Sequence, residues 1–397
     1  MSRTSSIPRL RILGALAVLT GSEGCVDFPK EGADYCERNK VVCGQASSSE
    51  PLIDQASARG HHTLARGVDG SVWALGDNSS GQLGDGTREN STKAHMVSGL
   101  DAVTQVAAGY HHSLALRAGK VLSWGQPGTG PVQERPELVS GLDSIDSIAA
   151  GESHSLALSR SEAVWAWGTN TAGQSSNTPV LVQGLPGIDQ IAAGNAHSLA
   201  LDVNGVVWAW GDNSAGQLGD GTLGGSRTAP TKVKGLPVDS RIKLIAAGGL
   251  HSLALDGNGV VWAWGDNSEG QLGDGTKTGP RPTPVRVIGL KEVTALAAGM
   301  KHSLALTSGK SIMAWGDNSA GQLGIDTVSS GEVSPMETRR LTRVQSISAG
   351  HSFSLAVESS NCLYGWGSNA RGQVGKGLGD APPQLQAPFY IICQVER

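Results

Sequence analysis

One sequence unit recurs along the whole of this chain, and it constrains the fold more than any other feature. Each copy opens with a segment like Ile-Ala-Ala-Gly, passes through two variable residues and continues as His-Ser-Leu-Ala-Leu. In the best-preserved copies a glycine turn follows. After it come the segments Val-Val-Trp-Ala-Trp-Gly-Asp-Asn-Ser and Gly-Gln-Leu-Gly-Asp-Gly-Thr. A unit that returns at a near-constant interval indicates a repeat architecture, in which each copy buries its apolar faces against its neighbours.

The histidine of this unit serves as an anchor for counting the copies. It occurs six times, and Phe353 fills the same position in a seventh copy: His62, His112, His154, His197, His251 and His302. The interval between anchors suits a four-stranded propeller blade of roughly 40–50 residues. All ten tryptophans lie in or beside the Trp-Gly element of the unit, so the copies share a packing scheme.

The local pattern predicts short strands rather than helices. Within one copy we expect strands at 188–193, 197–201, 206–210 and near 231–235, because each run is bounded by Gly, Asn, Asp or Pro. Both faces of these strands carry apolar or small side chains, which suits a sheet that is covered on both sides. The sequence therefore predicts an all-β fold, a seven-bladed β-propeller of four-stranded antiparallel blades closed into a ring.

The ends of the chain complete the expected domain organisation. We expect a signal peptide at 1–24, an N-terminal tether at 25–50 and the propeller at 51–397. The apolar run 389–395 is expected to form an extra closing strand after the seventh blade.

The first residues have the sequence pattern of an export signal. Arg3, Arg9 and Arg11 precede the apolar run 12–20, which is too short to span a bilayer. Small residues then lead to Cys25, which we expect to accept lipid after cleavage; plain secretion is the alternative. We therefore expect an extracytoplasmic protein of a bacterial cell envelope, whose membrane contact is an N-terminal lipid.

Five cysteines in an exported chain need an account. If Cys25 carries lipid, four remain, and three pairings are possible. Proximity in sequence favours a small loop closed by Cys36 and Cys43 and a second bond between Cys362 and Cys393.

Charge argues against a nucleic-acid partner. The net charge is −4 and only 17% of the residues are charged, against about 25% in average globular proteins. No long basic run provides the cationic footprint that nucleic-acid binding needs. We expect a monomer with an unidentified protein partner.

The repeat resembles the regulator-of-chromosome-condensation repeat family. The resemblance lies in Gly-x-x-His-Ser-Leu-Ala-Leu at 194–201, 248–255 and 299–306, and in Trp-Gly-x-Asn-x-x-Gly-Gln-Leu-Gly at 210–219, 264–273 and 315–324. It extends over about 51–395 and implies a seven-bladed propeller. The name-giving member is a nuclear nucleotide-exchange factor, but a fold does not carry its function with it. The β-lactamase-inhibitor propellers of exported bacterial proteins, similar in context, bind an enzyme through the loop before each such histidine strand.

The recurring polar residues are expected to build the scaffold. One histidine per blade places the anchors around a ring, where each imidazole bonds a turn. The Gly-Asp-Asn-Ser loops lack the terminal Glu of a calcium loop, and Asp and Asn often bond their own turns. No nucleophile, phosphate-loop or zinc motif occurs. We therefore predict no catalytic residues, no metal and no cofactor.

The positions that vary on this constant frame are the candidate binding site. The two residues before each anchor change most, and turns at one end of a ring share one face. Unselected drift of the loops is the alternative. The candidate partner-binding residues are His61, Tyr110, His111, Glu152, Ser153, Asn195, Leu250, Met300, Lys301 and Ser352. The degenerate loops after Trp124 and Trp167 are expected to leave a notch on the opposite face.

We therefore predict a protein-binding scaffold and no enzyme. The alternatives are a hydrolase or lyase on a propeller scaffold, which needs titratable groups that converge, and a guanine-nucleotide exchange factor by family analogy, which needs residence in the cytosol.

Overall fold

The computed structural model describes residues 51–169, 175–375 and 384–393. The expected signal peptide at 1–24, the lipid-acceptor Cys25, the Cys36–Cys43 pair and the tether at 25–50 lie outside the described residues. The described residues form strands joined by turns and loops.

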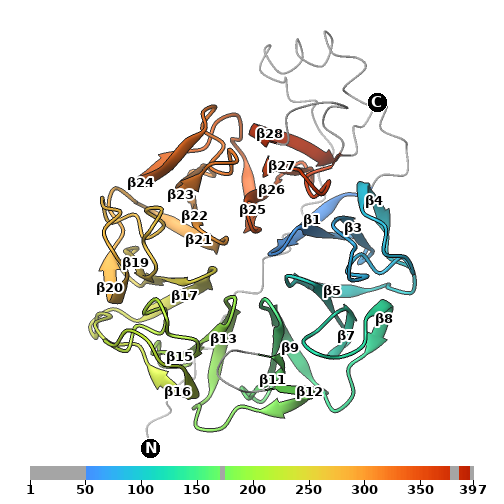
Figure 1. Ribbon diagram of the computed structural model, residues 1–397, viewed down its shortest axis with the longest axis horizontal. Coiled ribbons are helices and arrows are strands. Elements are labelled where there is room, and N and C mark those ends of the chain that lie inside the picture. Colours follow the sequence, from blue (N-terminus) through green and yellow to red (C-terminus); the bar gives the residue numbers. More distant parts are fainter. Residues whose placement is uncertain (1–50, 170–174, 376–383, 394–397) are drawn as a thin grey trace, which may run out of the picture. The chain divides into compact units, whose positions relative to one another are not determined.

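Seven four-stranded antiparallel sheets make up the described part of the chain, so the predicted seven-bladed all-β propeller is confirmed. Each sheet is one blade and takes four consecutive strands in sequence order, and the blades stand around a common centre (Figure 1). None of the described residues forms a helix.

Two strands of each blade lie nearest the centre. The first strands contact the first strands of both neighbouring blades: they are β1 (Ile53–Ala58), β5 (Val103–Ala108), β9 (Ile145–Ala150), β13 (Ile188–Ala193), β17 (Ile242–Ala247), β21 (Val293–Ala298) and β25 (Val344–Ala349). The second strands begin at the anchor residue: they are β2 (His62–Gly67), β6 (His112–Arg117), β10 (His154–Ser159), β14 (His197–Asp202), β18 (His251–Asp256), β22 (His302–Thr307) and β26 (Phe353–Glu358).

The other two strands lie farther out. The third strands carry the Trp-Gly element: they are β3 (Val72–Gly76), β7 (Lys120–Gly125), β11 (Val164–Thr169), β15 (Val207–Gly211), β19 (Val261–Gly265), β23 (Ile312–Asn318) and β27 (Leu363–Ser368). The fourth strands form the outer edges: they are β4 (Ser91–Met96), β8 (Gln133–Leu138), β12 (Ser175–Leu181), β16 (Arg227–Lys232), β20 (Arg281–Arg286), β24 (Ser329–Glu337) and β28 (Gln384–Ile392).

The ring closes by packing of blade 7 against blade 1 without a shared strand. Strand β1 contacts β25 and β26, and the Ile53 amide donates to the Asn361 carbonyl across the junction. The prediction that 389–395 forms an extra strand after the seventh blade is wrong. The described part of that segment lies largely within β28, the fourth strand of blade 7, because the described residues after 343 form four strands.

The apolar core lies between the blades. In the cluster between blades 4 and 5, Leu199, Leu201 and Ala209 pack against Ala254 and Trp264 of the next blade. Every residue of β14 and β18 is buried, because each blade is covered on both faces. The apolar and small residues on both faces of the predicted strands had indicated that each sheet is covered on both sides.

A disulfide joins Cys362 to Cys393, as predicted. It links the start of β27 to the residue after β28, and so fastens the last strand of the chain to blade 7. A search of the described residues finds no helix of the length and hydropathy that a bilayer crossing requires.

One expectation about the loops needs correction. In a four-stranded antiparallel blade, the turn between strands one and two and the loop between strands three and four lie at the same end. The Gly-Asp-Asn loops therefore share the face of the variable turns, as the bond from the Asp266 amide to the Leu250 carbonyl shows. The shortened loop of blade 2 therefore lies on this face and not on the opposite one, and the loop after Trp167 lies mostly outside the described residues.

Candidate functional site

The turns between the first and second strands gather around the centre of the ring at one end. We call this end the turn face; its seven turns are residues 59–61, 109–111, 151–153, 194–196, 248–250, 299–301 and 350–352. Each turn directly precedes an anchor, so the pair of variable residues lies here, as predicted.

A closed circle of backbone hydrogen bonds links these turns from blade to blade. In every blade, a turn amide donates to a carbonyl in the turn of the next blade, and blade 7 donates back to blade 1. The seven bonds are Gly60 to Gly109, Tyr110 to Gly151, Glu152 to Asn195, Asn195 to Gly249, Gly249 to Gly299, Met300 to His351 and His351 to Gly60, with N–O distances of 3.0–3.3 Å.

A second set of backbone bonds holds each turn from its own blade. The amide of the residue after the conserved glycine, at or near the end of the third strand, donates to the carbonyl of the residue before the anchor, and this bond occurs in all seven blades. The donors are Asp77, Gln126, Thr169, Asp212, Asp266, Asp317 and Ser368, and the acceptors are His61, His111, Ser153, Ala196, Leu250, Lys301 and Ser352.

A glycine ends the third strand and makes this second bond possible. Gly265, for example, has a φ of +103°, and a Cβ there would overlap the Leu250 carbonyl oxygen. The backbone of each turn is thus fixed twice by groups that any residue possesses, while its side chains are free to differ. This is how a propeller can present different chemistry on one rigid frame.

The ten predicted binding residues all lie on the turn face, and most are half-buried. Glu152 is exposed, whereas Asn195 is buried, with 8% of its surface accessible. Lys301 reaches outward to Glu269 in the neighbouring loop, with an N–O distance of 3.4 Å. Ser153 and Leu250 line the same face but make no side-chain hydrogen bond among the described residues.

Blades 7, 1 and 2 bring four aromatic rings together. His61 lies 4.7 Å from His351 and 5.5 Å from Tyr110, measured between ring centroids, and Tyr110 lies 4.7 Å from His111. The Tyr110 hydroxyl and the His61 Nε2 are 3.3 Å apart, and the His351 Nδ1 bonds the Ser352 hydroxyl. Burial lowers the pKa of His61 to about 4 and lowers that of His351, so these two imidazoles are neutral near pH 7.

The anchor histidines take no part in this surface, because all six are buried. Each Nε2 lies 2.9–3.0 Å from the serine hydroxyl that follows the anchor in the next blade; the pairs are His62–Ser113, His112–Ser155, His154–Ser198, His197–Ser252, His251–Ser303 and His302–Ser354. These bonds form a second circle beneath the turns, interrupted at Phe353.

In four of these pairs the serine fixes which ring nitrogen carries the proton, because Ser113, Ser252, Ser303 and Ser354 each donate to a backbone carbonyl. The Ser252 hydroxyl donates to the Gln217 carbonyl, which can only accept, so Ser252 must accept from the Nε2–H of His197. The same carbonyl also accepts from the indole of Trp264. The predicted scaffold role of the anchors is confirmed, but the predicted partner is wrong: each imidazole bonds a serine of the next blade and not a turn.

The same environment keeps the anchors uncharged. Each Nδ1 has no partner among the described residues, so a second proton would be buried without an acceptor. Burial lowers the pKa of His62, His112 and His251 to about 3 and that of His154 and His302 to about 4, and lowers that of His197 well below its usual value.

The aspartates of the Gly-Asp-Asn loops are likewise occupied by their own turns. In blade 5, Asp266 accepts from the Gln271 amide and the Ser268 hydroxyl, and Asn267 accepts from the Leu272 amide. Asp212 and Asp317 repeat this network in blades 4 and 6. In the part of the chain that the structure describes, no group of three His, Cys, Asp or Glu side chains has the arrangement of a metal site.

Sequence reasoning missed two residues of the turn face. His351 precedes Ser352 and completes the aromatic patch, but only Ser352 was selected from that copy. Arg59 takes the place of the glycine that ends Ile-Ala-Ala-Gly in the six other copies. Comparing the copies position by position would have found Arg59, since it is the one departure at that position.

Models of one protein family match most of the propeller. The model described as RCC1-like domain matches residues 175–394, more than half of the chain. Two models of the regulator of chromosome condensation (RCC1) repeat match residues 69–116 and 145–174.

Curated relatives match a shorter stretch. A human protein, "Probable E3 ubiquitin-protein ligase HERC6", is 34% identical over 154 residues, which are 38% of this chain and 15% of the relative. "RCC1 domain-containing protein RUG3, mitochondrial" of Arabidopsis thaliana is 35% identical over 155 residues, 38% of this chain and 34% of the relative. The matched region thus spans 15% of one of these relatives and 34% of the other.

A solved structure resembles the whole ring. The crystal structure of Prp20p from Saccharomyces cerevisiae, described together with its binding properties to Gsp1p and histones, has a TM-score of 0.71 and 24% identity. The match covers 83% of this chain and 87% of that one. At this identity the likeness concerns the fold alone.

Proposed function

We propose that this chain, which belongs to the RCC1-like domain family, is a protein-binding β-propeller, exported and lipid-anchored, that contacts its partner through the turn face. One observation carries the proposal. The turn backbones are held by two sets of hydrogen bonds in every blade, whereas their side chains are the most variable part of the repeat. A rigid frame with variable side chains binds without a large loss of conformational entropy.

The composition of the face also supports a protein partner. Tyr110, Met300 and three histidines lie near its centre, and aromatic residues and Met are enriched in the cores of protein interfaces. Prp20p, which shares the fold, is described as binding the protein Gsp1p and histones. Binding rather than catalysis is further supported by the anchors, because four of their partner serines already donate their hydroxyl protons to backbone carbonyls.

Export remains an inference from the first 25 residues. Arg3, Arg9 and Arg11, the short apolar run and Cys25 favour a lipid-anchored protein of a bacterial envelope. The Cys362–Cys393 disulfide supports an oxidising compartment. Mass spectrometry of the mature N-terminus tests this: we expect an acylated Cys25, and an unmodified thiol there would contradict lipid anchoring.

Affinity capture from the native envelope tests the binding face. The bait is the native chain, compared with a variant carrying Tyr110→Ser, Met300→Ser and Lys301→Ser. A control variant carries Val68→Ser, Asn204→Ala and Asn258→Ala in turns at the opposite end of the blades, where all three side chains are exposed. We expect the turn-face variant alone to lose the partner.

Equal capture by all three baits would refute the turn face as the binding site. A partner lost only with the control variant would move the site to the opposite face. Circular dichroism and the urea midpoint of each variant establish that the propeller is intact.

A further inference from the structure

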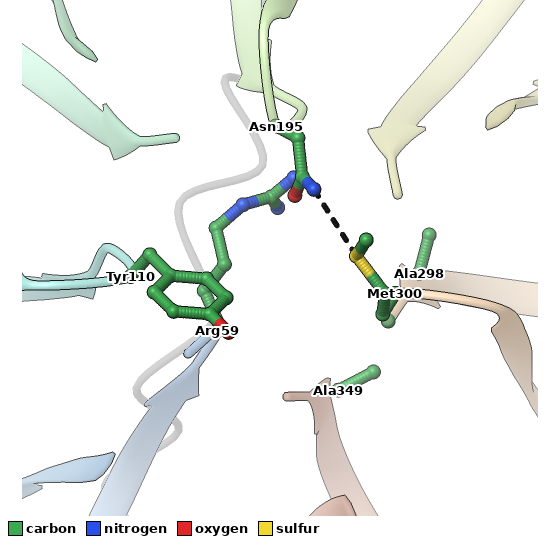
Figure 2. A pocket seen from close by; sticks show the side chains of 7 residues that line it. Arg59, Tyr110, Asn195, Ala298, Met300 and Ala349 are labelled. Carbon is green, nitrogen blue, oxygen red and sulfur yellow. Dashed lines mark hydrogen bonds between the residues drawn. The ribbon is translucent and has the colours of Figure 1, made fainter. Parts of the chain in front are cut away.

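A single arginine extends across the turn face toward the centre of the ring. Arg59 lies at the end of β1, and its guanidinium reaches the far side, in blade 5. There Nη1 donates to the Ala247 carbonyl at 3.1 Å and Nη2 donates to the Gly248 carbonyl at 2.9 Å. Figure 2 shows the side chain directed away from its own strand and into the space among the turns.

The positive charge of Arg59 lacks a counter-ion among the described residues. Its two partners are neutral carbonyls, and its Nε is buried without a partner. Glu152 is the acid whose charge acts on it most, but Glu152 is exposed and forms no ion pair with it. Arg59 as a whole is half-buried, but a guanidinium held partly away from water is normally paired, because it has lost hydration without gaining a counter-ion.

A second donor beside the guanidinium is also poorly matched. Asn195 is buried, and its Nδ2 donates to the Met300 sulfur at 3.1 Å. A thioether is a weak acceptor, so this amide retains most of its capacity to bond a stronger one. Asn195 and Arg59 line the same pocket, and their side chains overlap in the view of Figure 2.

The surrounding walls limit what could bind here. Tyr110, Ala298, Met300 and Ala349 line the pocket together with Gly299, and none of them is acidic. The side chains leave no space of the size of a water molecule, so a ligand must draw the flexible guanidinium away from its carbonyls. One guanidinium beside one amide matches the two oxygens of a carboxylate, which arginine binds with two parallel hydrogen bonds.

We propose that Arg59 and Asn195 bind a carboxylate presented by a protein partner, an Asp or Glu side chain that enters the centre of the turn face. The proposal rests on the proposed function and specifies the chemistry of the partner. An acidic side chain suits the site better than free phosphate, since its apolar stem can contact Tyr110 and Met300. A phosphate would bring about two charges to a single cation.

A peptide titration tests this without knowledge of the partner. The probes are blocked Ala-Glu-Ala, blocked Ala-Gln-Ala and inorganic phosphate, added to the full chain while NMR follows the Arg59 Nε–H and the Asn195 side-chain amide. We expect saturable shifts with the Glu peptide alone. Arg59→Met should weaken that binding by at least about tenfold, the minimum for losing a hydrogen bond to a charged group.

Two further variants keep the test decisive. Arg117→Gln removes an exposed arginine that pairs with Asp101 and should bind the Glu peptide as the native chain does. Arg59→Lys retains the charge without the planar fork; it should bind more weakly than the native chain and serves if Arg59→Met does not fold. No binding by the native chain, equal binding by folded Arg59→Met and native protein, or tighter binding of phosphate would each overturn the proposal.

The capture experiment separates this proposal from the one on which it rests. If Arg59→Met captures the same partner as the native bait while the turn-face variant does not, the carboxylate site is wrong and the protein-binding function stands. If the turn-face variant and the native bait capture the partner alike, the turn face is not the binding site, and that part of the proposed function fails together with the carboxylate site.

Discussion

At the scale of single residues, the buried anchor histidines tie the stability of the ring to pH. In the folded state their pKa lies well below the value of about 6.5 in an unfolded chain. Below pH 6.5 the anchor imidazoles therefore bind protons in the unfolded chain but stay unprotonated in the folded chain. The stabilising contribution of the neutral ring is complete above pH 6.5 and is lost as the pH falls from there toward 3.

This predicts a urea midpoint that falls steadily between pH 7 and pH 5. At pH 5.5 the free energy of unfolding should be lower by about 1.4 kcal/mol for each such histidine than at a pH well above 6.5. His251→Phe, which copies the residue found at 353, should flatten the pH dependence by the share of one histidine. A midpoint that does not change with pH over this range would show that the anchors are not held neutral.

The glycines that end the third strands should be among the least replaceable residues. In Gly265→Ala the new Cβ meets the Leu250 carbonyl oxygen, in a backbone conformation that favours glycine. We expect a loss of at least about 2 kcal/mol in the free energy of unfolding. The matched control is Gly309→Ala, because a Cβ on Gly309 would make only an ordinary contact, 3.7 Å from the Thr307 hydroxyl, and Gly309 has no positive φ. Equal midpoints for the two variants would contradict this account.

The role of a residue could be predicted from the sequence when that residue recurs in the copies of the repeat. The anchors were correctly assigned to the scaffold because six equivalent histidines cannot converge on one site. Their partner serines were not identified, because the bond joins different blades and no local spacing reveals it. Arg59 was missed for the opposite reason: it occurs once, in a segment that was read for what it shares with the other copies.

At the scale of the element, β28 depends on the disulfide. The bond between Cys362 and Cys393 closes a 31-residue separation that contains the last loop. By the chain-entropy argument, its loss should lower the free energy of unfolding by about 3–4 kcal/mol. We expect a lower urea midpoint for the Cys362→Ala, Cys393→Ala double variant, and the same shift when the native chain is reduced. If neither treatment moves the midpoint, the disulfide does not hold this strand.

The strands of a regular copy were predictable to within a few residues, because Gly, Asn and Pro mark their ends. The predicted 188–193 is β13, whereas the fourth strand of that blade runs over Arg227–Lys232 rather than 231–235. Fourth strands pair on one side only and follow loops of different length, so their register is weakly encoded. The same weakness led to the incorrect extra strand at the end of the chain.

At the scale of the whole molecule, the junction between blades 7 and 1 departs from the others. Phe353 replaces the anchor, Thr63 stands where other blades have serine, and Leu75 replaces the tryptophan. The Thr63 hydroxyl still donates to the Gln373 carbonyl. The histidine bond and the indole bond that join blades 6 and 7 have no counterpart among the described residues here.

Ring closure should therefore be the first interface to open. The Ile53 amide donates to Asn361 across the 7–1 junction, and the Val344 amide makes the equivalent bond to Lys310 across the 6–7 junction. Two missing bonds of about 1 kcal/mol each predict that Ile53 exchanges its amide proton about tenfold faster or more. Hydrogen exchange measured by NMR compares the two amides within one molecule, so differences in overall stability cancel. Installing Thr63→Ser and Phe353→His together should slow exchange at Ile53 and leave Val344 unchanged. If Ile53 is already as protected as Val344, packing around Phe353 alone closes the ring, and the hydrogen bonds between blades contribute little to holding it shut.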